Sequence, residues 1–292
     1  MSMDPVNFIL SIFSGIGNKL LEKKSEPSHL TIQNTIQIPE FIKDEKLDGN
    51  SEVSGIVKRL NEFKELLNES KKKDKYTIAK LAKIMGLKSV GELERIFTGR
   101  DEPDFEFIKN FCDLFNLNEE WLTEGKQNPF YLYKPVHDNQ IYYYRYIKEC
   151  RARNVYLIRA VNGEAYGCTF IILELSDFKY EIIRRLCNIN IDDKACGWRD
   201  LYEMYKLIRK LDNDTDIHIT GKSLNESIFN LLYSGKIFPG TILKYPSDND
   251  PWWYDFMDVY NENFSLEYYQ NKYGSGFVTA QKVVKTYLET EK

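Results

Sequence analysis

The segment from Ser54 to Phe130 constrains the fold most, because its apolar residues recur at three- and four-residue steps in five short runs. Residues that favour the start or the end of a helix separate these runs. Thr77 and Ser89 have side chains that can cap a helix start, and Gly86 and Gly99 permit the left-handed backbone that ends a helix. The pattern predicts an all-α module of five helices, over 54–68, 78–85, 89–98, 103–115 and 118–124.

The third predicted helix has an inward and an outward side. The apolar residues expected to point inward are Val90, Leu93, Ile96 and Phe97. The residues left on the outward side are Gly91, Glu92, Glu94, Arg95 and Thr98. Ser89-Val-Gly-Glu92 also matches a capping box, in which each side chain accepts a hydrogen bond from the other residue's backbone N–H. The outward side is the surface that this helix would present to a partner.

Charge is unevenly distributed along this segment. Residues 54–100 contain 12 Lys and Arg against 6 Asp and Glu, whereas residues 101–130 contain 2 against 8. The whole chain has a net charge of −4, which gives no general attraction to nucleic acid. One side of the module could therefore meet phosphates while the acidic part turns away.

Three stretches of this segment carry a resemblance to a known family. They are Thr77-Ile-Ala-Lys-Leu-Ala-Lys-Ile-Met-Gly86-Leu, then Thr98-Gly99-Arg100-Asp-Glu-Pro103, and finally Leu117-Asn-Glu-Glu-Trp121-Leu122-Thr-Glu-Gly125 with the following Pro129-Phe130. In order and spacing they resemble the Cro/repressor (XRE-type) helix-turn-helix family, particularly its phage-repressor members. The resemblance implies a five-helix module whose third helix enters the major groove, usually as a dimer on a two-fold symmetric site.

The resemblance leads to a set of expected DNA contacts, with Arg95 as the leading candidate for a base or phosphate contact. The full set is Lys80, Lys83, Lys88, Ser89, Glu94, Arg95, Thr98 and Arg100. Glu92 is interpreted as the capping residue, while the carboxylates of Glu92 and Glu94 would oppose phosphates and accept only from a base such as cytosine. The lysines at 71–75 are open to two interpretations, a phosphate clamp or a solvated loop.

Residues 1–24 are predicted to form an amphipathic helix. Apolar residues fall on one side of it at helical spacing, namely Phe8, Ile9, Ile12, Phe13, Ile16 and Leu20. We expect self-association or docking, and not membrane binding, because the polar side carries little positive charge near its start. The stretch lacks the basic start of a signal peptide and is too short to span a bilayer. Residues 25–53 are predicted to be a linker with one short strand at 30–38.

Residues 131–292 are predicted to form an α+β domain of undetermined topology. Two β-rich runs, 155–161 and 166–175, flank Asn162-Gly163, a pair suited to a tight hairpin turn. A further strand is predicted at 216–220, and Ser223-Leu-Asn-Glu226 matches another capping box. Helices are predicted over 197–211, 223–233, 252–263, 265–273 and 277–288.

Adjacent aromatic residues stand out in this domain, at 142–146 and 252–254. Neighbours on a helix or a strand diverge, so these rings cannot all face one core. Three roles remain open for them: dimerisation or partner contact, ordinary packing between layers, or a small-ligand pocket.

No catalytic, metal or cofactor site is predicted. The chain has no Walker loop, GxGxxG or HExxH motif. Self-cleavage of the phage-repressor type is not expected, because Ser234 lies in Tyr-Ser-Gly-Lys and Lys272 in a polar helix. The five widely spaced cysteines and three separated histidines indicate reduced thiols and no zinc site.

The leading hypothesis is a cytoplasmic, sequence-specific DNA-binding transcriptional regulator of prophage or mobile-element type, acting as a homodimer or higher oligomer. Its second domain would serve dimerisation or sensing. One alternative is that the helix-turn-helix fold is a protein-docking module in an oligomeric assembly, which the acidic third helix favours. The other is a phage-defence effector whose second domain acts on nucleic acid or a nucleotide. An enzyme is the less favoured class because no residue constellation supports one.

Overall fold

The computed structural model describes residues 52–69, 71, 73–133, 139–191, 197–244 and 249–291. The predicted helix over 1–24 and the predicted strand at 30–38 lie outside these residues, so both stay predictions. Of the predicted linker, only Glu52 and Val53 are described, and they begin the first described helix. None of the helices in these ranges is both long enough and apolar enough to cross a membrane.

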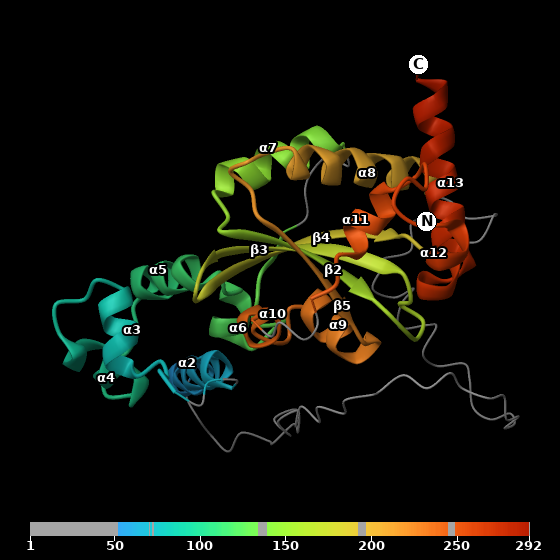
Figure 1. Cartoon of the computed structure of the whole chain (residues 1–292). Helices are drawn as coiled ribbons and strands as arrows, with labels where there is room; N and C mark the ends of the chain where they lie inside the picture. The colour runs from blue at the N-terminus through green and yellow to red at the C-terminus, as the bar shows by residue number, and fades with distance from the viewer. Residues whose placement is uncertain are drawn as a thin grey trace, which may run out of the picture. The chain divides into compact units, whose positions relative to one another are not determined.

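Five helices occupy the described residues from 52 to 124 (Figure 1). They are α2 (Glu52–Asn68), α3 (Ile78–Ile84), α4 (Val90–Phe97), α5 (Phe105–Phe115) and α6 (Glu119–Glu124). Thr77 caps α3 as predicted, since its side chain accepts from the backbone N–H of Lys80, and Asn118 caps α6 in the same way. Gly86 and Gly125 have φ angles of +71° and +72°, which allow the chain to turn sharply after α3 and α6.

The start of α4 differs from the sequence prediction in two respects. Ser89 occupies the N-cap position, but its side chain makes no capping hydrogen bond, so the predicted capping box with Glu92 is not formed. Val90, predicted to point inward, is 44% exposed. Val90 is exposed because α4 begins at the protein surface, after the exposed Lys88 and Ser89. Water can satisfy the first backbone N–H groups there in place of the Ser89 side chain.

The rest of the described chain is an α+β region built on a mixed sheet. Within the described residues the sheet has five strands, in the order β1-β4-β3-β2-β5. The strands are β1 (Leu132–Tyr133), β2 (Asn154–Ala160), β3 (Cys168–Ser176), β4 (Lys179–Asn188) and β5 (Ile219–Leu224). Strands β2, β3 and β4 form an antiparallel meander, whereas β1 and β5 run parallel to β4 and β2.

The predicted hairpin exists, but the predicted two-residue turn does not. Strands β2 and β3 pair from Asn154↔Glu174 to Arg159↔Thr169, and a longer connection over 161–167 joins them. This connection is held by Glu226, which donates its backbone N–H to Asn162 Oδ1 and accepts from the backbone N–H of Ala165. The turn is therefore held by the start of a helix much later in the chain, α9 (Glu226–Tyr233).

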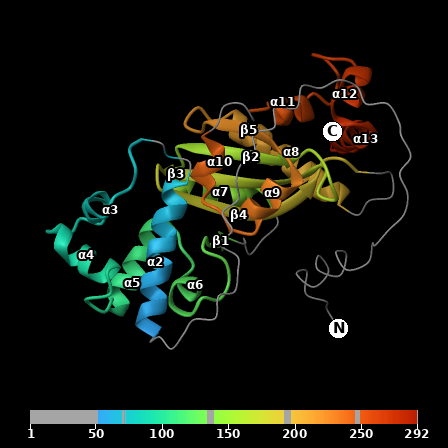
Figure 2. The ribbon, with the colours of Figure 1, turned by 90° about the horizontal axis from the view of Figure 1, so that it is seen from below.

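Helices cover both faces of the sheet (Figure 1). They are α7 (Gln140–Cys150), α8 (Trp198–Asp212), α9 (Glu226–Tyr233), α10 (Pro239–Leu243), α11 (Trp252–Met257), α12 (Leu266–Tyr273) and α13 (Ser275–Thr290). Alternate residues of β2 face opposite layers: Val155 and Leu157 pack with α7, α8 and α11–α13, whereas Tyr156 and Ile158 pack with α9 and α10. Figure 2, seen from below, shows α9 and α10 crossing the second face.

Three further local predictions are corrected by the structure. Ser223 belongs to β5, and Asn225 caps α9 by accepting from the backbone N–H of Ile228, so the predicted capping box at 223–226 is wrong. The strand predicted at 216–220 lies at Ile219–Leu224. Helix α11 ends at Met257 and does not reach residue 263, because the Asp258 side chain accepts from backbone N–H groups of the following turn.

The helical region and the sheet share one hydrophobic cluster. The rings of Phe115 on α5 and Phe178 at the β3–β4 turn are 5.5 Å apart, and those of Phe130 and Phe238 are 5.8 Å apart. Asn116, which ends α5, donates its side-chain N–H to the backbone carbonyl of Tyr180 at 2.7 Å. The helices are therefore packed directly against the β3–β4 turn and the start of α10.

Candidate nucleic-acid interface

Helix α4 is fixed by its buried side. Leu93 is fully buried and Phe97 nearly so, and both belong to the hydrophobic cluster that also contains Ala82 of α3. The backbone N–H of Leu87 bonds to the carbonyl of Ala82 at 3.0 Å, and the side chain of Asn61 on α2 donates to the carbonyl of Phe97 at 3.0 Å. These contacts set the direction in which the other side of α4 points.

All eight residues predicted to contact DNA are exposed. They are Lys80, Lys83, Lys88, Ser89, Glu94, Arg95, Thr98 and Arg100. They come from α3, from the turn between α3 and α4, from α4 and from the residues that follow it. The described residues therefore leave this flank of α4 uncovered by the chain's own side chains.

Two of these side chains already have partners within the chain. Arg95 Nε lies 2.6 Å from Asp101 Oδ2, and this hydrogen bond raises the pKa of the Arg95 guanidinium. The Thr98 hydroxyl donates to the carbonyl of Glu94 at 2.8 Å. The Arg95–Asp101 pair is about half-exposed on both sides, so water screens it and separating the two groups costs little.

The immediate surroundings of α4 are not basic. The exposed cations from 88 to 102 are Lys88, Arg95 and Arg100. The exposed carboxylates in the same stretch are those of Glu92, Glu94, Asp101 and Glu102. Exposed positive charge lies instead in the preceding part of the helical region, on Lys73, Lys75, Lys80 and Lys83.

The two aromatic groups are divided between core and surface, as the divergence of neighbouring side chains requires. Tyr143 and Trp252 are buried, whereas Tyr142 and Tyr254 are exposed. Tyr146 stacks on Tyr133 with ring centroids 4.0 Å apart and bonds to the buried Glu181. Most of the first group therefore packs between layers, which was one of the open alternatives.

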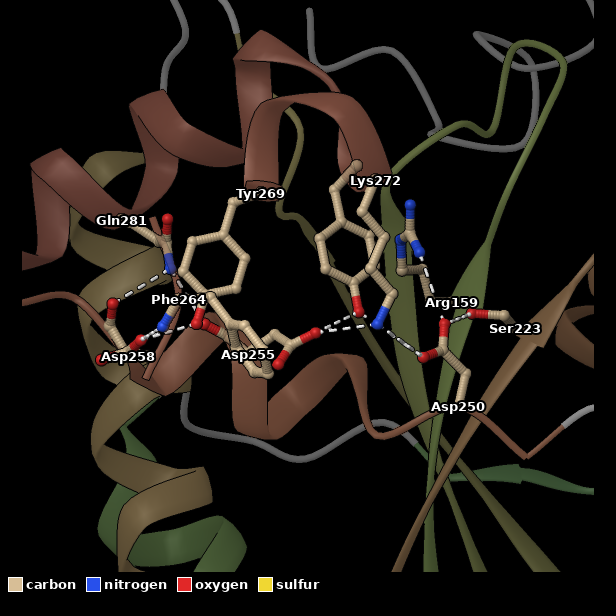
Figure 3. Close-up of polar contacts among 10 residues, drawn as sticks. Arg159, Ser223, Asp250, Asp255, Asp258, Phe264, Tyr269, Lys272 and Gln281 are labelled. Carbon is tan, nitrogen blue, oxygen red and sulfur yellow. Dashed lines mark hydrogen bonds and ion pairs between the residues drawn. The ribbon is translucent and has the colours of Figure 1, made fainter. Parts of the chain in front are cut away.

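A second concentration of charge lies between the sheet and helices α11 and α12, where Asp255 is buried and Lys272 remains exposed (Figure 3). Asp255 on α11, only 4% exposed, accepts from Lys272 Nζ at 3.0 Å and from the Tyr273 hydroxyl at 2.6 Å. Asp250 accepts from the Ser223 hydroxyl of β5 at 2.5 Å. Asp250 also lies 3.9 Å from Lys272 Nζ, so one ammonium group bridges the two carboxylates.

Arg159 of β2 is the buried cation of this network. Its guanidinium NH1 lies 3.8 Å from Asp250 Oδ2 and its centre 4.7 Å from the centroid of the Tyr273 ring. Burial lowers the pKa of Arg159, while Tyr166 and Asp250 oppose that shift. The signal for this pairing in the sequence is an arginine inside the apolar run of β2, since a buried arginine needs a carboxylate partner.

Asp258 completes the network at the other end of α11. Its carboxylate accepts from the backbone N–H groups of Glu262 and Asn263 at 2.8 and 3.0 Å and from the Tyr269 hydroxyl at 2.6 Å. Burial favours a raised pKa, but these hydrogen bonds outweigh it and lower the pKa of Asp258. Gln281 of α13 donates to the backbone carbonyls of Asp255 and Asp258. The network therefore fastens α11, α12 and α13 to the sheet.

Across the described ranges, no three His, Cys, Asp or Glu side chains gather in a way that could hold a metal ion. Comparison with protein-family models, with curated proteins and with solved structures finds no match to this chain.

Proposed function

We propose that this protein is a sequence-specific DNA-binding transcriptional regulator of prophage or mobile-element type, acting in the cytoplasm as a dimer or higher oligomer. In this proposal helices α2–α6 are a helix-turn-helix domain, α4 enters the major groove, and the α+β region serves dimerisation or sensing. The observation that carries the proposal is the exposed side of α4, which follows the sharp turn at Gly86 and is held in place by Leu93 and Phe97.

Arg95 is the residue proposed to read a base. It lies in the last turn of α4, on the exposed side, and a guanidinium can donate two hydrogen bonds to the O6 and N7 atoms of guanine. The hydrogen bond to Asp101 uses only Nε of Arg95. The other two guanidinium nitrogens could therefore bond to a base without breaking the Arg95–Asp101 pair. Lys80 and Lys83 on α3 and Lys88 in the following turn would contact phosphates.

The surface proposed for dimerisation lies on the α+β region. Five of its large exposed apolar side chains lie close together in sequence from α11 to α12, namely Tyr254, Tyr260, Phe264, Leu266 and Tyr268. Phe264 and Tyr268 stack on each other with ring centroids 4.4 Å apart, so they present a combined surface. Exposed aromatic side chains of this kind support an interface between protein chains.

The direct test measures binding to the DNA just upstream of the protein's own gene over a range of salt concentrations. We expect binding at low salt whose affinity falls steeply as salt rises, because phosphate contacts release counterions. Absence of binding at low salt, or binding insensitive to salt, would falsify the proposal.

The residue-level test is Arg95→Ala. We expect operator affinity to fall by about fivefold to a hundredfold, with a much smaller loss on unrelated DNA, since the lost contact is to a base. Lys109→Ala is the matched control, because Lys109 is also an exposed cation paired at 2.6 Å with a carboxylate, that of Asp113, but lies on α5. Thermal unfolding of both variants checks that the fold is kept.

The carboxylates around α4 favour a second function, docking of a basic protein partner. Glu94→Gln separates the two functions because they predict opposite signs. If α4 binds DNA, removing this charge relieves repulsion from phosphates and affinity for DNA rises. If α4 binds a basic protein surface instead, neither the wild-type protein nor the variant binds DNA, and the variant assembles less tightly with the protein partner.

A further inference from the structure

Cations from separate parts of the chain meet at the turn between β3 and β4. Lys244, which follows α10, lies 3.0 Å from Asp177 Oδ1, and Arg153, which precedes β2, lies 3.8 Å from the same atom. The hydroxyl of Tyr76, from the connection between α2 and α3, donates to the backbone carbonyl of Asp177 at 3.3 Å. The helical region and the α+β region thus meet around one exposed carboxylate.

Two more cations gather on the ring of Tyr76. Lys71 Nζ and Lys80 Nζ each lie 4.7 Å from the ring centroid, so their ammonium groups are at most twice that distance apart. That separation is comparable with the Debye length, about 8 Å at physiological ionic strength. The two ammonium groups therefore add to one local region of positive charge.

Tyr76, whose ring the two lysines contact, is held in place by hydrogen bonds and burial. Tyr76 is almost completely buried, and its backbone N–H and carbonyl both bond to the side chain of Asn68 at the end of α2, at 2.6 and 3.0 Å. Figure 2 shows this end of α2 beside β3. The ring that the two lysine side chains contact is therefore fixed at the junction of the two regions.

The positive charge at this junction is only partly neutralised. Burial lowers the pKa of Lys71, nearby Lys244 and Lys80 lower it further, and Asp177 and Asp74 oppose the shift. Lys71 thus lies within the electrostatic reach of cations from both regions. Four basic side chains share two carboxylates, which leaves a net positive surface.

We propose that Lys71, Lys80, Arg153 and Lys244 form a junction patch that binds the phosphate backbone of duplex DNA beside the site contacted by α4. This inference rests on the proposed function and adds that the α+β region itself touches the DNA. Lys80 lies in the first turn of α3. In a helix-turn-helix motif the helix at this position crosses the DNA backbone. Arg153 and Lys244 extend the positive surface from this helix onto the sheet region. Such contacts carry no sequence information and strengthen binding to any duplex.

The test is the double variant Arg153→Gln/Lys244→Gln, which removes only the α+β half of the junction patch. Both side chains are exposed and their shared partner Asp177 is exposed too, so the fold is expected to be unchanged. The control is Lys109→Gln/Lys126→Gln, since both of these lysines are exposed and paired at 2.6 Å with carboxylates. The probes are a duplex from just upstream of the protein's own gene and an unrelated duplex of equal length.

We expect the double variant to bind both duplexes about threefold to thirtyfold more weakly, and the slope of log affinity against log salt to shrink by about 2. The control should bind like the wild-type protein. Asp177→Asn should act in the opposite direction and tighten binding to both duplexes, because it removes a charge that repels phosphates.

The outcomes separate this inference from the proposed function. If the double variant keeps wild-type affinity and salt slope while Arg95→Ala loses operator binding, the junction patch is refuted and the proposed function stands. A loss confined to the operator duplex also refutes the patch as a phosphate contact. If the wild-type protein binds neither duplex at low salt, both proposals fail.

Discussion

The charged network between the sheet and α11–α12 differs from the charged surface of α4 and the junction patch in how far its charges are paired within the protein. In the network between the sheet and α11–α12, the carboxylates of Asp250 and Asp255 are matched by Arg159 and Lys272 at 3.0 to 3.9 Å. At the junction patch, four cations stand beside the carboxylates of Asp177 and Asp74, and on the exposed side of α4 the cations and the more numerous carboxylates are in contact with water. A charge satisfied inside the protein holds elements together, whereas an exposed and unneutralised charge is available to a partner.

The difference has an energetic basis. Taking an ion out of water costs several kcal/mol, so a buried charge persists only with partners, and removal of one partner leaves the other unsatisfied. Exposed charges pay no such cost and contribute little to stability. Substitutions in the first region should therefore change unfolding, and substitutions in the second should change binding.

The largest expected effect is that of Asp255→Asn. The neutral amide cannot replace the charged acceptor of Lys272 and Tyr273, so we expect a loss of about 3 kcal/mol in the free energy of unfolding. Urea denaturation followed by circular dichroism measures it. A loss close to zero would mean that the buried network does not hold α11 and α12, and the contrast between the two regions would disappear.

An intermediate effect is expected from Asp258, through pH. Because the pKa of Asp258 is lower in the folded protein than its ordinary 3.8, the charged form stabilises the fold above that value, and this stability is lost as the pH falls through the folded pKa. Asp258→Asn should unfold more easily than the wild-type protein at pH 7, by about 2 kcal/mol. The gap between the two proteins should close in strong acid, and a gap that is constant with pH would contradict this origin.

The smallest effect on stability is expected from Asp101→Asn. The Arg95–Asp101 pair is exposed, so the midpoint of urea unfolding should move by less than about 0.2 M. DNA affinity should instead rise a fewfold, because the guanidinium of Arg95 is released and a carboxylate leaves the surface. A clear loss of stability would mean that the Arg95–Asp101 pair stabilises the fold as the buried network does, and the contrast between the two regions would not hold.

The sequence predicted best those features that depend on residues close together in the chain. The helix starts at Thr77 and Asn118 and the turns at Gly86 and Gly125 follow from the local chemistry of caps and glycines. The capping box at Ser89 is not formed although the same rules predict it, and the equally exposed Thr77 does form its cap, so exposure alone does not decide the outcome.

The features that the sequence did not reveal depend on residues that are distant in the chain. Arg159 finds Asp250 and Tyr273 only because β2 and β5 are neighbours and α12 packs beside them. Likewise, the sequence leaves two interpretations for Lys71 because it does not show that Lys244 lies nearby. Only the fold brings Lys244, at the end of α10, close to the connection between α2 and α3. No local periodicity contains this information.

The direct packing of α5 on the β3–β4 turn has a consequence for the kind of operator that this protein would accept. Phe115 and Asn116 fix the helices to the sheet without a free tether, so a dimer joined through the α+β region would hold its two α4 helices at a set separation. Such a dimer measures distance along the duplex. Inserting half a helical turn between the two half-sites would turn one of them to the far side of the DNA and remove simultaneous binding, whereas inserting a full turn would test how far the assembly can stretch.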